Sequence, residues 1–128
     1  MDISTTNSND LENAPEKREM AAFMVELHHE PETCIASGYG DTESNAINLM
    51  KMGDSAKELG AELVGGWSFP IGHRQWYVIK ATDAHVVAEL VRITNLHLWN
   101  TITVNPVMDH DMFSEKILGK LIKQEVSS

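Results

Sequence analysis

Residues 21–27 (AAFMVEL) have the pattern of a half-buried strand, whose side chains point in turn to opposite faces of a sheet. One face is apolar and consists of Phe23, Val25 and Leu27. The other face is mixed and carries Met24, Glu26 and His28. A carboxylate and an imidazole two residues apart are unusual on a strand face. The surroundings of this second face therefore bear directly on function.

Three further strands are predicted. Residues 61–69 form one of them, in which Gly65 and Gly66 indicate a bulge or a close approach of backbone. Residues 74–81 (RQWYVIKA) combine the aromatic and β-branched residues that favour strands. Residues 101–107 alternate sharply, with Ile102 and Val104 on one face and Thr101, Thr103 and Asn105 on the other.

Helical spacing of apolar residues predicts three helices. The first begins near Thr42, ends near Gly60 and buries a stripe of Ala46, Leu49, Met50, Gly53, Ala56 and Leu59. The second is capped by Asp83 and buries Ala84, Val87, Leu90, Val91 and Thr94. The third begins at Asp109 or Asp111 and has an apolar stripe of Phe113, Ile117, Leu118, Leu121 and Ile122.

The order strand, helix, strand, strand, helix, strand predicts an α+β fold of the ferredoxin-like βαββαβ type. In that fold a four-stranded antiparallel sheet has both main helices on one face. We predict this domain over residues 20–109, followed by a C-terminal helix and tail over residues 110–128. Residues 1–19 are polar and acidic, so we predict a flexible tail there.

Charge and composition exclude several classes of partner. The chain of 128 residues carries a formal net charge of −9, which disfavours nucleic acid and anionic membrane surfaces. No apolar run reaches the ~20 residues of a membrane span, and the N-terminus lacks the pattern of a secretory signal. A single cysteine cannot form an internal disulfide, which fits a cytoplasmic protein.

The layout of the elements, together with the motif His29-Glu30-Pro31-Glu32-Thr33-Cys34 after the first strand, resembles the dimeric α/β-barrel superfamily. More narrowly, residues 20–109 are similar to small domains near the GYD and YCII-related families. The resemblance implies that two sheets pack face to face in a homodimer or larger homo-oligomer, with a small-molecule ligand in the barrel or in an adjacent cleft. The superfamily includes cofactor-free monooxygenases, isomerases, cyclases and haem-binding enzymes, so it does not fix one activity.

Four of the six histidines lie at strand ends or in loops next to strands, namely His28, His29, His73 and His97. Imidazole near a carboxylate suits transition metals and also general acid–base catalysis, so these four are candidate metal ligands. A hydrogen-bonded structural role is the alternative for each. His85 is predicted on a solvated helix face and His110 in an exposed acidic turn.

The mixed face of the first strand supplies the candidate catalytic pair, Glu26 and His28. Glu26 would act as a general base if its pKa were raised by burial, or it would pair with Arg74 or Lys80. Cys34 would be a thiolate ligand, a nucleophile or an inert apolar residue. Candidate ligand-binding residues around the pair are Trp67, Arg74, Trp76, Tyr77 and Asn105.

Two classes of function follow. In the first, the protein binds a small molecule or a metal, and it is an enzyme if the Glu26 and His28 site is catalytic. In the second, it is an assembly or regulatory module in which the sheet face mediates oligomerisation.

Overall fold

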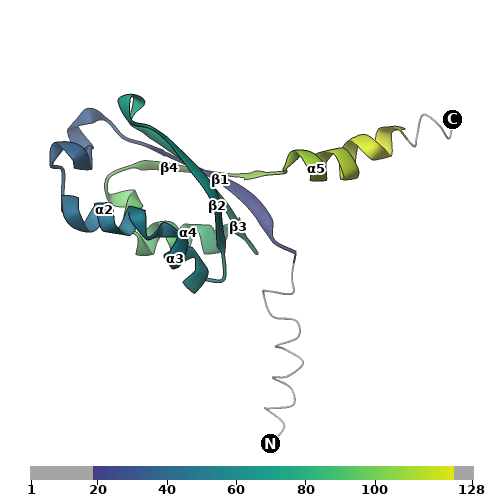
Figure 1. Ribbon diagram of the computed structural model, residues 1–128, viewed down its shortest axis with the longest axis horizontal. Helices are drawn as coiled ribbons and strands as arrows, with labels where there is room; N and C mark the ends of the chain where they lie inside the picture. Colours follow the sequence, from purple (N-terminus) through teal and green to yellow (C-terminus); the bar gives the residue numbers. More distant parts are fainter. Residues whose placement is uncertain (1–18, 123–128) are drawn as a thin grey trace, which may run out of the picture.

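The computed structural model describes residues 19–122, which form an α+β fold with a four-stranded antiparallel sheet. The strands are β1 (Ala21–His28), β2 (Glu62–Phe69), β3 (Arg74–Ala81) and β4 (Thr101–Val107), in the sheet order β2-β3-β1-β4. Helices α2 (Thr42–Met50), α3 (Met52–Glu58) and α4 (Ala84–Ile93) pack on one side of the sheet (Figure 1). The four strands predicted from the sequence are confirmed, while the tail predicted over residues 1–19 lies, except for Glu19, outside the described residues.

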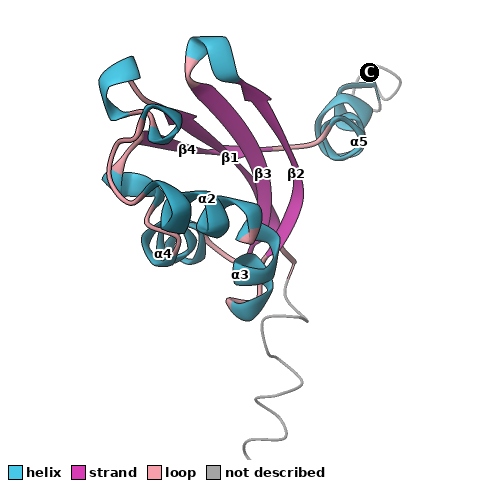
Figure 2. Ribbon diagram, turned by 60° about the vertical axis from the view of Figure 1, so that its left-hand side comes forward, coloured by secondary structure: helices cyan, strands magenta, loops and turns pink. Residues whose placement is uncertain are grey.

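The two faces of the sheet differ as the alternation in β1 predicts. Phe23, Val25 and Leu27 are buried beneath the helices, and Ile102 and Val104 of β4 pack against the same core. Within residues 19–122, no helix lies on the opposite face (Figure 2). Pairing within the sheet shows that this open face consists of alternate residues of all four strands: Ala22, Met24, Glu26, His28, Glu62, Gly65, Trp67, Phe69, Arg74, Trp76, Val78, Lys80, Thr101, Thr103, Asn105 and Val107.

The first predicted helix is two helices, which corrects the predicted apolar stripe. The side chain of Asp41, rather than Thr42, accepts a hydrogen bond from the Ser44 N–H and caps α2. The helical geometry is interrupted at Lys51, where φ is −97° and ψ is 15°. As a result Met50 is 85% exposed, and Met52 is buried in its place.

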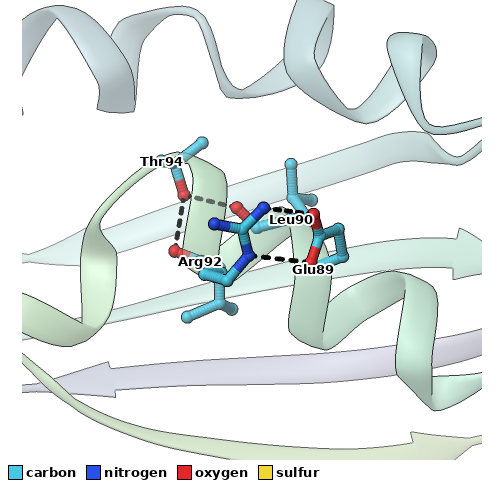
Figure 3. Close-up of polar contacts among 5 residues, drawn as sticks. Glu89, Leu90, Arg92 and Thr94 are labelled. Atoms are coloured by element: carbon cyan, nitrogen blue, oxygen red, sulfur yellow. Dashed lines mark hydrogen bonds and ion pairs between the residues drawn. The ribbon is translucent and has the colours of Figure 1, made fainter.

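The second predicted helix, α4, is confirmed, and polar contacts define both of its ends. Asp83 accepts a hydrogen bond from the Val86 N–H at the start. At the end the buried Thr94 hydroxyl donates to the carbonyl oxygens of Leu90 and Val91 (Figure 3). Arg92 forms two hydrogen bonds with Glu89, which hold the pKa of that carboxyl below its usual value. These contacts stabilise the two ends of α4, after which the chain leads to β4.

The glycines of β2 mark both a bulge and a close approach, as predicted. The register with β3 shifts between Leu63 and Gly65. A Cβ atom on Gly66 would lie 2.4 Å from Cδ1 of Tyr77, whose ring packs against the core. Burial raises the pKa of the Tyr77 hydroxyl, and a hydrogen bond with Ser68 partly offsets that rise.

Replacing Gly66 with alanine is therefore expected to destabilise the fold by about 1–3 kcal/mol, the usual range for an overpacked site. Denaturant unfolding measures the change. Gly60 serves as a contrast because no atom lies within 4 Å of a Cβ built there. Gly60→Ala should therefore destabilise the fold only through the strain of an alanine at the positive φ of 76°. If Gly66→Ala leaves the free energy of unfolding unchanged, the Tyr77 ring moves freely and the close approach does not constrain β2.

The C-terminal helix begins where the sequence predicts, with Asp109 accepting from the Met112 N–H. It comprises α5 (His110–Phe113) and the π-helical segment η6 (Ser114–Leu118), and it remains helical to residue 122. Its apolar stripe is exposed, because the helix extends away from the sheet and the other helices (Figure 1). Within residues 19–122, no helix is both long enough and apolar enough to cross a membrane.

Candidate metal centre

Three side chains from distant parts of the sequence meet at one end of the sheet. One ligand atom from each of His29, Cys34 and His73 lies within 4.8 Å of the other two. Cys34 is buried and the two histidines are half-buried. Among the described residues, this is the only group of three or more His, Cys, Asp or Glu side chains arranged closely enough to hold one metal ion.

The backbone of the strand ends brings these three residues together. His29 directly follows β1, and its N–H donates to the carbonyl oxygen of His73, which precedes β3. Pro31 then starts a 3-10 turn, and the Cys34 N–H donates to the Pro31 carbonyl oxygen. This turn folds the chain back, so the proline spacing in the motif from His29 to Cys34 places the thiol beside the imidazoles.

His73 occupies a backbone conformation that is uncommon for a residue with a side chain. It ends the turn η4 (Pro70–Gly72) between β2 and β3 with φ of 54° and ψ of 42°. This left-handed region favours glycine, although histidine is found there more often than most residues. The turn thereby directs the imidazole of His73 toward His29, with Nδ1 of His73 3.2 Å from Nε2 of His29.

Asn100 fixes the tautomer of His29. The Asn100 amide nitrogen donates to the Leu96 carbonyl oxygen at 3.1 Å, so its Oδ1 is the atom that faces His29. Oδ1 lies 2.9 Å from Nδ1 of His29 and accepts the proton of that nitrogen. In the neutral ring, Nε2 of His29 is then the nitrogen with the lone pair, and it lies 3.2 Å from Nδ1 of His73.

An apolar pocket adjoins all three side chains. It has a volume of about 330 Å³ and is lined by His29, Cys34, Ile35, Ala36, Ser37, Leu49, Ser68, Pro70, His73, Arg74, Gln75 and Trp99. The buried Trp99 ring lies 5.1 Å from the His29 ring and forms one wall. A second pocket of about 290 Å³ shares His29 and Trp99 with the first, and His28, His97 and Asn100 also line it. Only the first pocket is lined by all three side chains of the cluster.

Two of the four predicted metal ligands, His29 and His73, are in the cluster, and Cys34 joins them. His28 points to the open face of the sheet, between Arg74 of β3 and Thr101 of β4. His97 is exposed in the turn before β4 and lines the second pocket but not the one that adjoins the cluster. His85 is 99% exposed in its side chain, and His110 is exposed, both as predicted.

The predicted catalytic and ligand-binding residues are divided between the two faces. Glu26 pairs with Arg74 at 2.5 Å on the open face, which is one of the two roles predicted for it. Trp67 and Trp76 are paired on the same face, and Asn105 lies opposite Met24. Tyr77 lies on the helix-covered face instead, whereas Lys80, the other predicted partner of Glu26, lies on the open face.

Sequence reasoning did not identify Asn100. A signal was present, because Trp99 and Asn100 immediately precede β4. In an antiparallel sheet the start of β4 lies at the same edge as the end of β1, where His29 is placed.

Comparisons with protein-family models, with curated proteins and with solved structures find no match for this chain.

Proposed function

We propose that the protein binds one transition-metal ion through Nε2 of His29, Sγ of Cys34 and Nδ1 of His73. The observation that carries this proposal is the convergence of the three ligand atoms within 4.8 Å. Nitrogen ligands about 2.0–2.1 Å from a tetrahedral zinc ion are about 3.4 Å from each other. The two ring nitrogens are already 3.2 Å apart, which is close to that separation.

The chemistry of the ligands favours a metal that accepts both nitrogen and sulfur. Two imidazoles and one thiolate suit Zn²⁺ and copper, while Mg²⁺ and Ca²⁺ prefer oxygen. Three protein ligands leave the fourth position of a tetrahedral ion open, as in catalytic zinc sites. The adjoining pocket of about 330 Å³ offers room for water or a small molecule at that position.

The proposal is tested by titrating the full-length protein with Zn²⁺ and measuring stoichiometry and affinity by calorimetry. One ion per chain is expected, and His29→Ala and His73→Ala should each abolish tight binding. His85→Ala is the control, because that side chain is remote from the cluster and exposed. If both ligand variants bind Zn²⁺ as the wild type does, the cluster is structural and the proposal fails.

His28→Ala separates this site from the one predicted on the open face. Loss of metal with His28→Ala but not with His29→Ala would favour the Glu26 and His28 site, which stays a prediction. The opposite result favours the cluster at the strand ends. Because the two histidines are adjacent in the sequence, this pair of variants is closely matched.

Replacing Asn100 with alanine is expected to weaken metal binding by about 10–100-fold, the usual loss when the hydrogen-bond partner of a ligating histidine is removed. Alanine cannot accept the Nδ1 proton of His29, so the ring loses its preference for presenting Nε2. Asn100→Asp keeps an oxygen acceptor and should restore most of the affinity. Equal affinities for the two variants would contradict this role for Asn100.

We also propose that two copies associate through the open sheet faces, as the resemblance to dimeric α/β barrels implies. The strand order β2-β3-β1-β4 with helices on one face is compatible with the ferredoxin-like arrangement of that superfamily. Exposed aromatic side chains support the association, since Trp67 and Phe69 are 61% and 51% exposed on this face. Large exposed apolar patches commonly mark interaction sites.

A further inference from the structure

The C-terminal helix carries an apolar stripe that contacts little else within residues 19–122. Its exposed apolar side chains are Phe113, Ile117, Leu118, Leu121 and Ile122, with exposed fractions between 38% and 62%. The first turn, α5, packs mainly against its own continuation, η6. Lys116 forms an ion pair with Glu19 at 3.3 Å, but both side chains are exposed, and such pairs contribute little.

The open sheet face, on which aromatic and aliphatic side chains are mixed with polar ones, is the second surface without cover among the described residues. Trp67 and Phe69 of β2 are its most exposed aromatic side chains. At the end of β4, the exposed residues Val107 and Met108 connect the sheet to the helix. The helix leaves the sheet through Met108 and Asp109 alone, and it stands away from the sheet of its own chain in both views (Figures 1 and 2).

We infer that the helix over residues 110–122 crosses to a second copy of this chain and packs its apolar stripe over the β2 edge of the open sheet face of that copy, beside the contact between the two sheets. A two-fold axis would make the contact reciprocal, so both exposed surfaces of both copies would be covered at once. This inference rests on the proposed association of two copies. It adds the helix as the element that makes the association stable.

The size of the two surfaces fits a stable dimer. Alternate residues of four strands give about 15 side chains on the open face, and the helix adds 13 residues. A standard interface uses about 20–30 residues from each partner. One face of the sheet together with one helix therefore supplies enough surface.

Other occupants of the two surfaces are less suitable. Residues 1–18 contain only Met1, Ile3, Leu11 and Ala14 as apolar side chains besides Pro15, and residues 123–128 contain only Val126. Neither segment has enough apolar surface to cover the sheet or the helix. An anionic membrane is disfavoured by the net charge of −9.

The test is the mass of the full-length protein in solution, measured by light scattering over a range of micromolar concentrations. The wild type should have twice the monomer mass of 14.3 kDa. Ile117→Glu combined with Leu121→Glu should raise the dimer dissociation constant by about 100-fold or more, since a single side chain at the centre of an interface often accounts for about 30-fold. Glutamate is a good helix former, so the helix itself is retained.

Two further variants locate the contact. Trp67→Glu should also dissociate the dimer, because Trp67 would lie beneath the helix of the partner. Met50→Glu is the control, since Met50 is highly exposed but belongs to the helix layer on the other side of the sheet. Its dimer should be unchanged.

Each other outcome overturns the inference. A monomeric wild type, or a dimer that survives both glutamate substitutions in the helix, removes the helix from the interface. Dissociation by the helix variants but not by Trp67→Glu would mean that the helices pair with each other. A monomer that binds vesicles of anionic and neutral phospholipids would assign the stripe to a membrane. Zn²⁺ affinity measured on the same variants tests the metal site separately. Failure of the metal-binding proposal can therefore be distinguished from failure of the helix contact.

Discussion

Replacing Cys34 with serine is expected to lower the affinity for Zn²⁺ by about 100-fold or more, because loss of a direct ligand should exceed the 10–100-fold cost of losing an outer partner. The thiolate is the only sulfur ligand in the cluster and the only one of the three that contributes a negative charge. A serine hydroxyl remains protonated near neutral pH and is a poor ligand for such a metal. The substitution changes only one atom, so the packing around residue 34 should persist.

Co²⁺ provides a direct readout of this sulfur. The wild type loaded with Co²⁺ should show sulfur-to-metal absorption in the near ultraviolet, and Cys34→Ser should lack it even at saturating metal. His85→Ala should keep both the absorption and the affinity. A Cys34→Ser protein that binds Zn²⁺ within a few-fold of the wild type would show that the thiol is a bystander.

Replacing Leu27 with alanine is expected to destabilise the fold by about 2–5 kcal/mol, the range for truncating a buried leucine. Leu27 is 0% exposed and lies in β1, which pairs with both β3 and β4. The helices cover it from above, so the cavity left by the substitution has little room to collapse. Denaturant unfolding, with the slope checked for constancy, measures the change.

Met50→Ala is the matched control for this effect. Met50 is 85% exposed, so the loss of its side chain removes little buried apolar surface. Its free energy of unfolding should stay within about 0.5 kcal/mol of the wild type, as for most surface substitutions. A loss below about 1 kcal/mol for Leu27→Ala would mean that the core repacks around the smaller residue.

Local patterns in the sequence determined the elements and most of the faces. Alternation in β1 assigns Phe23, Val25 and Leu27 to the core, and the structure confirms it. Asp83 and Asp109 cap their helices as predicted. In each case the side-chain oxygen accepts a hydrogen bond from the backbone N–H of the residue three positions later in the chain. Such features depend on neighbours in the chain, so they can be read without knowing the tertiary structure.

The break at Lys51 could not be read in this way. The apolar spacing in residues 42–59 fits one continuous helix, which would have buried Met50. Packing against the sheet instead favours two shorter helices that bury Met52 and Ala56. The sequence supports a stripe with Met50 and a stripe with Met52 almost equally, and tertiary contacts determine that Met52 is the one buried.

The candidate site shows the same division. The sequence identified four histidines near strand ends and the motif from His29 to Cys34, but it could not decide which of these residues meet. That choice depends on the turn before β3, which directs His73 toward His29. It also depends on the start of β4, which brings Asn100 within hydrogen-bond distance of Nδ1 of His29. Spacing along the chain fixes local geometry, whereas three ligands that lie as many as 44 residues apart come together only through the pairing of the strands that carry them.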